Sequence, residues 1–233
     1  DPGQRKVKQL VTDIFNEQQA ECRERLRKAQ KDTANDVAKN PFDRDAWNKE
    51  FARRAKPVIR ELIDVAGTNA IADLGIGLRF EVDRPQIANF IRVRAQRFAQ
   101  EVNDTTWNAL RDSLAEGFDS GEGISALMER VDAVMGDRIR SSAETIARTE
   151  TQGATSGGTI EAWRDTGVVK NKVWISALIP GRSREAHMDA HNQTVALDEQ
   201  FDIGGVMTDG PGLSGVAEVD INCLCAMIAV VEG

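Results

Sequence analysis

The sequence predicts an α+β fold, in which a mostly helical N-terminal region precedes a smaller C-terminal module of short strands and long loops. Apolar residues recur at helical spacing through most of the first 166 residues. Residues 168–175 and 225–231 have the composition of strands, and Gly, Asp, Ser and Pro dominate between them. We therefore divide the chain into a helical region, 1–136, and a C-terminal domain, 137–233.

The composition is that of an ordinary globular protein. Charged residues make up 29% and hydrophobic residues 41% of the 233 positions. No apolar run approaches the length of a membrane span, and no signal peptide is visible, so we expect no membrane partner. The three cysteines, Cys22, Cys223 and Cys225, do not form a disulfide framework and fit a reducing compartment.

Charge is distributed unevenly along the chain. Residues 1–60 hold 15 basic against 10 acidic side chains, whereas residues 101–233 hold 10 against 22. An acidic protein is a poor general binder of nucleic acid, so only the first 60 residues offer a basic surface for weak DNA contact. A solvated helix face is the simpler interpretation, and we prefer it. The best candidates for contact are Arg23, Arg25, Arg27 and Lys28.

The first two helices are predicted from apolar stripes and their stop signals. Residues 4–39 form one long amphipathic helix, which the Asn40-Pro41 step ends. Asp43 is placed to cap the second helix. Pro57 lies inside the pattern of that second helix, and so predicts a kink or break there.

Three further helices are expected before residue 139. A third begins at Pro85 and runs through Val102, and Asp104 or Thr105 caps a fourth. A fifth, short helix ends at Gly136, because glycine is the usual residue just past a helix C-terminus.

The next helix, residues 139–166, is the one around which the C-terminal domain is organised. Small and apolar residues form a stripe along it, and Gly153 and Gly157 lie one turn apart on that stripe. Since glycine lowers helix propensity, two of them predict that another backbone approaches closely. Glu150 falls on the same face, where a buried carboxylate needs a partner.

Several short motifs follow one another in a specific order over about the last hundred residues. They are Ile146-Ala147-Arg148-Thr149-Glu150-Thr151, Glu161-Ala162-Trp163, Gly167-Val168-Val169, Val173-Trp174, Arg184 with His187, the Phe201 region, Pro211-Gly212 and Ile221-Asn222-Cys223-Leu224-Cys225. In this order they resemble the phage Mu F-like minor head proteins, also called the phage head morphogenesis family. Two departures are Leu224, where many members have arginine, and residues 180–183, where some members have a Cys-x-x-Cys pair.

The resemblance implies a minor structural protein of a tailed-phage head. Such a protein acts in head morphogenesis and in DNA packaging or ejection. It is made in the host cytoplasm, associates with the portal, and lies in the virion, in the capsid interior at the portal vertex near packaged DNA. We expect the helical region 1–136 to attach to the portal or to sister copies, because its first helix carries a long apolar stripe.

Two other functions stay open. The chain begins Asp1-Pro2 instead of Met, which permits it to be the C-terminal part of a portal protein fused to a Mu F-like domain. The other alternative is a zinc-dependent or toxin-like enzyme. We expect no enzyme, since no nucleotide-binding or hydrolase motif is present and no nucleophile or base lies at a suggestive spacing from Glu150.

The resemblance also marks a structural signature, which consists of Arg148, Thr149, Glu150, Arg184, His187, Asn222, Cys223 and Cys225. Within it, we expect Glu150 to bind Arg184, His187 or backbone amides near them, because an arginine fork matches a carboxylate.

Three residues of this signature, together with His191, raise the question of a metal site. His187 and His191 are four apart, which on a helix places both on one face, and Cys223 and Cys225 point the same way on a strand. These four could form a zinc site, although zinc-binding cysteine pairs are usually more widely spaced. We prefer a hydrogen-bonded His187 beside two buried thiols, with no metal and no cofactor.

Overall fold

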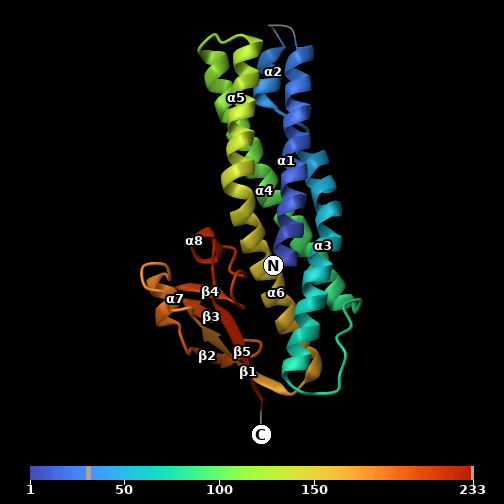
Figure 1. The fold of residues 1–233 in the computed structure, drawn as a ribbon, viewed down its shortest axis with the longest axis vertical. Coiled ribbons are helices and arrows are strands. Elements are labelled where there is room, and N and C mark those ends of the chain that lie inside the picture. The colour runs from blue at the N-terminus through green and yellow to red at the C-terminus, as the bar shows by residue number, and fades with distance from the viewer. Residues whose placement is uncertain (30–32, 232–233) are drawn as a thin grey trace. The chain divides into compact units, whose positions relative to one another are not determined.

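The computed structural model describes residues 1–29 and 33–231, and it confirms the α+β class (Figure 1). Its helical part consists of α1 (Pro2–Lys28), α2 (Ala34–Lys39), α3 (Arg44–Asp73), α4 (Pro85–Asp119), α5 (Ile124–Asp137), the π-helical η1 (Arg138–Ser142) and α6 (Ala143–Thr166). The C-terminal part consists of β1 (Val169–Ile175), α7 (Glu185–Asp189), β2 (Thr194–Ala196), β3 (Phe201–Ile203), β4 (Val206–Thr208), α8 (Ala217–Asp220) and β5 (Ala226–Val231).

Contacts divide the chain into two compact units that interleave in sequence. Unit 1 comprises residues 1–57 and 93–147, and unit 2 comprises residues 58–92 and 148–233. Helices α3, α4 and α6 therefore contribute residues to both units. The sequence-based division at residue 136 stays a prediction of functional domains.

Unit 1 is built from helices whose apolar stripes face one another. Helix α1 packs against α2, α5 and η1. Fully buried core side chains include Phe15 of α1 and Phe51 of α3, and Phe51 meets Phe98 edge to face with ring centroids 5.1 Å apart. A polar pair lies among them, because Gln18 donates to Asn103 Oδ1 at 2.6 Å.

The first predicted helix is shorter than expected. Helix α1 begins at Pro2, where Asp1 accepts the Gln4 amide at 3.0 Å, and ends at Lys28 because Ala29 takes an extended conformation. Residues 30–32, which the predicted helix 4–39 included, lie outside the described residues. The predicted stop before Asn40 is confirmed by the end of α2.

The apolar stripe of α1 is also better covered than its sequence indicates. Val7, Val11, Ile14 and Phe15 are each 0% exposed within unit 1. The sequence argument for a partner on this stripe therefore loses its basis.

Hydrogen bonds confirm the predicted start of one helix and show why another predicted start is wrong. Asp43 accepts the Ala46 amide at 3.0 Å, as a cap of α3 should, but α3 continues unbroken through Pro57. The fourth helix does not start at Asp104 or Thr105, because α4 is continuous there. Thr105 instead donates to the Glu101 carbonyl one turn back, and Asp104 binds Arg44 at 2.6 Å.

The predicted stop at Gly136 is wrong as well. Helix α5 ends at Asp137 and leads directly into the π turn η1, which leads into α6. Within η1, Ser141 donates to the Asp137 carbonyl at 2.7 Å, and the Arg138 guanidinium lies over the Phe15 ring at 5.3 Å. A glycine that keeps helical backbone angles does not end a helix, and here tertiary contacts support the continuation.

Two small antiparallel sheets lie in unit 2. The first has the strand order β2-β1-β5, with β1 at the centre, and β1 and β5 confirm the strands predicted for residues 168–175 and 225–231. The second is the hairpin β3-β4, whose two-residue turn is Gly204-Gly205. Both glycines have positive φ, which suits a tight hairpin turn.

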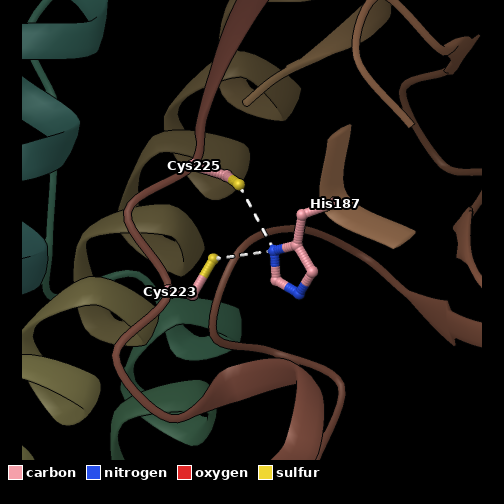
Figure 2. A group of neighbouring side chains, drawn as sticks. All are labelled: His187, Cys223 and Cys225. Carbon is pink, nitrogen blue, oxygen red and sulfur yellow. Dashed lines mark hydrogen bonds between the residues drawn. The ribbon is translucent and has the colours of Figure 1, made fainter. Parts of the chain in front are cut away.

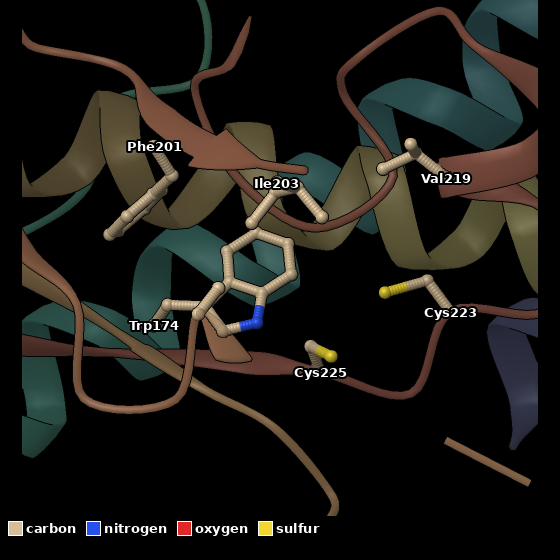
Figure 3. Packing of buried hydrophobic residues seen from close by; sticks show 7 residues of the cluster. Trp174, Phe201, Ile203, Val219, Cys223 and Cys225 are labelled. Atoms are coloured by element: carbon tan, nitrogen blue, oxygen red, sulfur yellow. The ribbon is translucent and has the colours of Figure 1, made fainter. Parts of the chain in front are cut away.

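Two apolar clusters hold unit 2 together. In one, Trp174 packs edge to face on Phe201 with centroids 5.3 Å apart, and Ile203, Val219 and the two cysteines surround it (Figure 3). The other cluster joins helices to strands and consists of Ala70, Ile71, Ala162, Trp163, Val169 and Leu197. Helix α6 therefore anchors the C-terminal module, as the sequence predicts, and α3 contributes a second anchor.

Within the described ranges, no helix combines the length and the apolar character that crossing a bilayer requires.

Candidate functional site

The most distinctive group of side chains in unit 2 consists of His187, Cys223 and Cys225 (Figure 2). His187 Nδ1 lies 3.4 Å from Cys225 Sγ and 3.6 Å from Cys223 Sγ. All three side chains are buried, and their potential ligand atoms lie within 4.8 Å of one another. This arrangement can either share protons between two thiols and an imidazole or hold a metal ion.

Two separate segments position these three side chains. His187 lies on the short helix α7, and its ring meets the Trp174 ring edge to face with centroids 5.8 Å apart. The cysteines lie in the extended segment that leads into β5. Leu224 between them is 49% exposed, so both sulfurs point inward, as the sequence predicts for alternating residues.

The pKa values of the two cysteine thiols are shifted in opposite directions. A hydrogen bond from the Cys223 thiol lowers the pKa of Cys225 far below its ordinary value, and His187 lowers it further, although burial opposes both effects. The same hydrogen bond raises the pKa of Cys223, and burial adds to this. Cys225 is therefore the sulfur that becomes a thiolate first. Cys22, in contrast, has a pKa raised to about 12 by burial, which makes it an inert apolar side chain.

Asn222 connects the cysteine segment to helix α6. Its side-chain oxygen accepts from Arg148 Nη1 at 3.0 Å, and its backbone amide donates to Thr149 Oγ1 at 3.2 Å. One turn further along α6, Gln152 donates to the Cys225 carbonyl at 3.0 Å. Asn222 has a φ of 56°, a left-handed conformation that asparagine tolerates better than most residues. Motifs that are 74 residues apart in sequence thus meet at one point.

Arg184 fixes the other side of the same segment. Its guanidinium donates to the carbonyl of Val219 at 3.2 Å and to that of Ile221. Asp220 then closes the turn before it, because its carboxylate accepts from the Ser214 hydroxyl at 2.8 Å and from the Gly215 amide at 2.7 Å.

The predicted close approach of another backbone is confirmed at Gly153, because a Cβ on Gly212 would lie 2.9 Å from the Gly153 amide nitrogen. The same prediction is wrong for Gly157, because a Cβ added there would meet the Phe90 ring instead of a backbone. Gly158, which the prediction did not include, does lie against backbone, since its added Cβ would lie 2.8 Å from the Ile63 carbonyl oxygen.

Glu150 is buried in this face of α6, at 9% exposure. The hydrogen bonds described for Arg184 run to carbonyl groups, and those for His187 run to sulfur. We expected Glu150 to link α6 to the C-terminal module. Hydrogen bonds of its neighbours in α6, Arg148, Thr149 and Gln152, provide such a link. The partner of Glu150 itself stays a prediction.

The alternative of a four-ligand zinc site loses one of its residues, His191. Helix α7 ends at Asp189, so His191 does not share a helix face with His187. Instead, His191 Nδ1 accepts the Ser176 backbone amide at 3.2 Å. Among the residues that the structure describes, the ligand group therefore contains His187, Cys223 and Cys225 only.

A cavity of about 270 Å³ opens beside this group. The histidine and both cysteines line it, and so do Arg148, Arg182 and Arg184. The lining of the cavity therefore combines nitrogen and sulfur donors with three arginines.

The four side chains proposed for DNA contact lie in unit 1, and each faces a carboxylate. Arg23 pairs with Asp132, Arg25 with Glu21 at 3.8 Å, Arg27 with Glu24, and Lys28 with Glu24 at 3.2 Å. These pairs are those of a solvated helix face, and DNA contact stays a prediction.

Sequence reasoning missed the contribution of three polar or small side chains. Gln152 and Asp220 bind backbone groups that no local pattern identifies in advance. Gly158 had a visible signal, since it follows Gly157 directly and doubles the glycine content of one helical turn.

The chain is similar in sequence to a known protein family and to several known proteins. The family described as "Phage Mu protein F like protein" matches residues 108–228, just over half of the 233 residues. The match begins within α4 and includes every residue of the signature. No solved structure matches the chain significantly.

Three curated proteins are similar to the chain over part of its length. An NAD(+)–arginine ADP-ribosyltransferase EFV of Enterococcus faecalis is 30% identical over 155 residues, which are 65% of this chain and 31% of that protein. The uncharacterized protein YqbB of Bacillus subtilis is 25% identical over 200 residues, 83% of this chain and 64% of that protein. The minor head protein GP7 of Bacillus phage SPP1 is 31% identical over 129 residues, 54% of this chain and 41% of that protein. The chain thus spans less than two thirds of each of these relatives.

Proposed function

Because the chain belongs to the phage Mu F-like family, we propose that it is a minor structural protein of a tailed-phage head. It acts in head morphogenesis, associates with the portal and lies inside the capsid near the packaged DNA. The observation that supports this most is the sequence shared with the minor head protein of phage SPP1. The meeting of the Arg148-Thr149 and Asn222 motifs in unit 2 supports it further, because the family match covers both.

Protease protection of assembled heads tests the proposed location. The tagged chain should copurify with heads, resist protease while the heads are intact, and be digested once the heads are disrupted. Absence from purified heads, or equal digestion before and after disruption, would contradict the proposal.

The helical region 1–136 remains the proposed surface for the portal or for sister copies. Deleting its first 40 residues is a poor test, because the stripe of α1 belongs to the core of unit 1. Val65 and Val93 are exposed instead, at 56% and 47%, and Val65→Glu with Val93→Glu should lower copurification with the portal. Ile228→Glu is the matched control outside this region, since Ile228 is 53% exposed. Loss with the control alone would refute this assignment.

Any contact with DNA is weak in this proposal. Arg23, Arg25, Arg27 and Lys28 would have to exchange their carboxylate partners for phosphates, so binding should collapse between low and physiological salt. Arg27→Ala with Lys28→Ala should weaken the low-salt binding, whereas Arg97→Ala with Arg111→Ala, an equal change in charge, should not. Salt-insensitive binding measured by fluorescence anisotropy would contradict this.

The chain is not an enzyme in this proposal, although one relative is named as an ADP-ribosyltransferase. That name belongs to a protein of which this chain covers 31%, and the proteins that share the similarity carry different names. The names of these relatives therefore do not agree on an activity that the chain would share. Incubation with labelled NAD and an arginine-rich acceptor should give no transfer of label above a blank without protein, and transfer at a rate proportional to protein concentration would restore the enzymatic alternative.

A further inference from the structure

We propose that His187 Nδ1 and the sulfurs of Cys223 and Cys225 bind a zinc ion, whose fourth coordination position is open to the adjacent cavity. The donor set of this group suits zinc. Two thiolates and one imidazole are ligands that zinc prefers over oxygen-rich alternatives such as magnesium or calcium. All three are buried in a loop-rich unit, at 5% exposure or less, where unpaired polar atoms would be costly.

The distances from His187 Nδ1 to the two sulfurs also suit zinc. With zinc–sulfur bonds of about 2.3 Å and zinc–nitrogen bonds of about 2.0–2.1 Å, tetrahedral geometry places nitrogen about 3.5 Å from each sulfur. The separations in the chain are 3.4 Å and 3.6 Å. Both nitrogen–sulfur separations thus match those that a tetrahedral ion requires.

A zinc ion at this position would also stabilise the fold of unit 2. His187 comes from α7. The cysteines come from a segment that is bound to α6 through hydrogen bonds of Asn222 and of the Cys225 carbonyl. A zinc ion would therefore join α7 to a stretch of this site that is tied to the long helix α6. Loop-rich modules with few apolar contacts often gain their stability from such a metal.

The fourth position follows from counting ligands. Among the described residues the group supplies three ligands, whereas closed structural zinc sites use four. The three donors line a cavity that Arg148, Arg182 and Arg184 also line. The remaining position should thus take water or a small anion, with the guanidinium groups favouring the anion.

Metal content measures the first part of the proposal. The full chain, purified under reducing conditions with zinc and then gel-filtered, should retain one zinc ion per chain. His187→Gln, Cys223→Ser and Cys225→Ser should each retain less than about a tenth of it, since each removes a direct ligand. His191→Gln and Cys22→Ser are the controls and should retain all of it. Wild-type protein without stoichiometric zinc, or zinc that survives all three ligand substitutions, would overturn the site.

Cobalt measures the geometry without relying on variants that fold poorly. Wild-type chain loaded with Co²⁺ should show thiolate-to-cobalt charge-transfer absorption and the intense visible bands of tetrahedral cobalt. Inorganic phosphate should then shift the visible bands if the fourth position is open. Octahedral bands without charge transfer would refute the ligand set, and a tetrahedral spectrum that phosphate leaves unchanged would refute the open position.

Discussion

Unit 1 buries long apolar stripes of helices, whereas unit 2 buries a histidine, two cysteines and glycines at points where backbones meet. In unit 1, side chains such as Phe15 and Phe51 fill the space between helices. In unit 2, Gly153 and Gly158 bring other segments against α6, and Asn222 joins two motifs by hydrogen bonds. The stability of unit 1 should therefore be most sensitive to a loss of side-chain volume. The stability of unit 2 should be most sensitive to added side-chain volume or to the loss of a specific polar contact.

The largest effect should come from emptying the core of unit 1. Phe51→Ala removes a ring that is 0% exposed and packed on Phe98, and should cost about 3–5 kcal/mol of unfolding free energy. Hydrogen exchange should then increase first in residues 1–57 and 93–147. Increased exchange confined to unit 2 would show that the two units do not differ in this way.

A single methyl group should do comparable damage in unit 2. Gly212→Ala forces alanine into a φ of +74° and places its Cβ 2.9 Å from the Gly153 nitrogen, which together should cost about 2–4 kcal/mol. Gly181→Ala is the matched control, because Gly181 has a φ of +71° but nothing within 4 Å of its added Cβ. Equal denaturation midpoints for the two variants would remove the argument from close approach.

Substitutions of Glu150 test how sensitive unit 2 is to the loss of a polar contact. Glu150→Ala should cost about 1–3 kcal/mol, because the carboxylate is buried and the group that it binds would lose its partner. Glu150→Gln should be milder if that group is an amide and nearly as harmful if it is an arginine. Limited proteolysis between residues 176 and 215 measures the loosening, and unchanged cleavage in both variants would argue against a structural role.

The smallest effect should come from exposed charge pairs in unit 1. Arg53 is bound to Glu50 at 2.7 Å, but its side chain is 70% exposed. Arg53→Ala should therefore leave the midpoint of urea unfolding nearly unchanged, because an exposed ion pair is screened by solvent and salt. A clear fall in that midpoint that disappears at high salt would show that this pair is more than a solvated contact.

Local signals predicted the positions of most elements, and tertiary contacts decided their ends. The cap Asp43, the strand before Ser176 and the helical spacing of residues 143–166 were all readable from sequence. Asp104 and Thr105 look like caps, yet α4 continues because Asp104 is engaged by Arg44 and Thr105 by its own helix. No local pattern contains that information.

The candidate site was predictable as a set of residues and less so as a geometry. His187, Cys223 and Cys225 were identified together, but His191 was included on the assumption that α7 extends by another turn. The role of Asn222 was not derivable, since its left-handed backbone and its two contacts on α6 depend on chain segments more than 70 residues away.

The π turn η1 has a consequence for the helical phase of the molecule. Buried residues follow one another at four-residue steps through Leu127, Val131 and Met135, and again through Ala143 and Ala147. In an α-helix each such step overshoots a full turn by about 40°, so the stripe would drift around the helix. The wider turn of η1 takes back part of that drift and returns α6 to the side on which α5 is buried. Removing one residue from this turn would rotate the buried stripe of α6 relative to that of α5 by about 100°. Residues 138–142 therefore determine which side of α6 continues the buried side of α5.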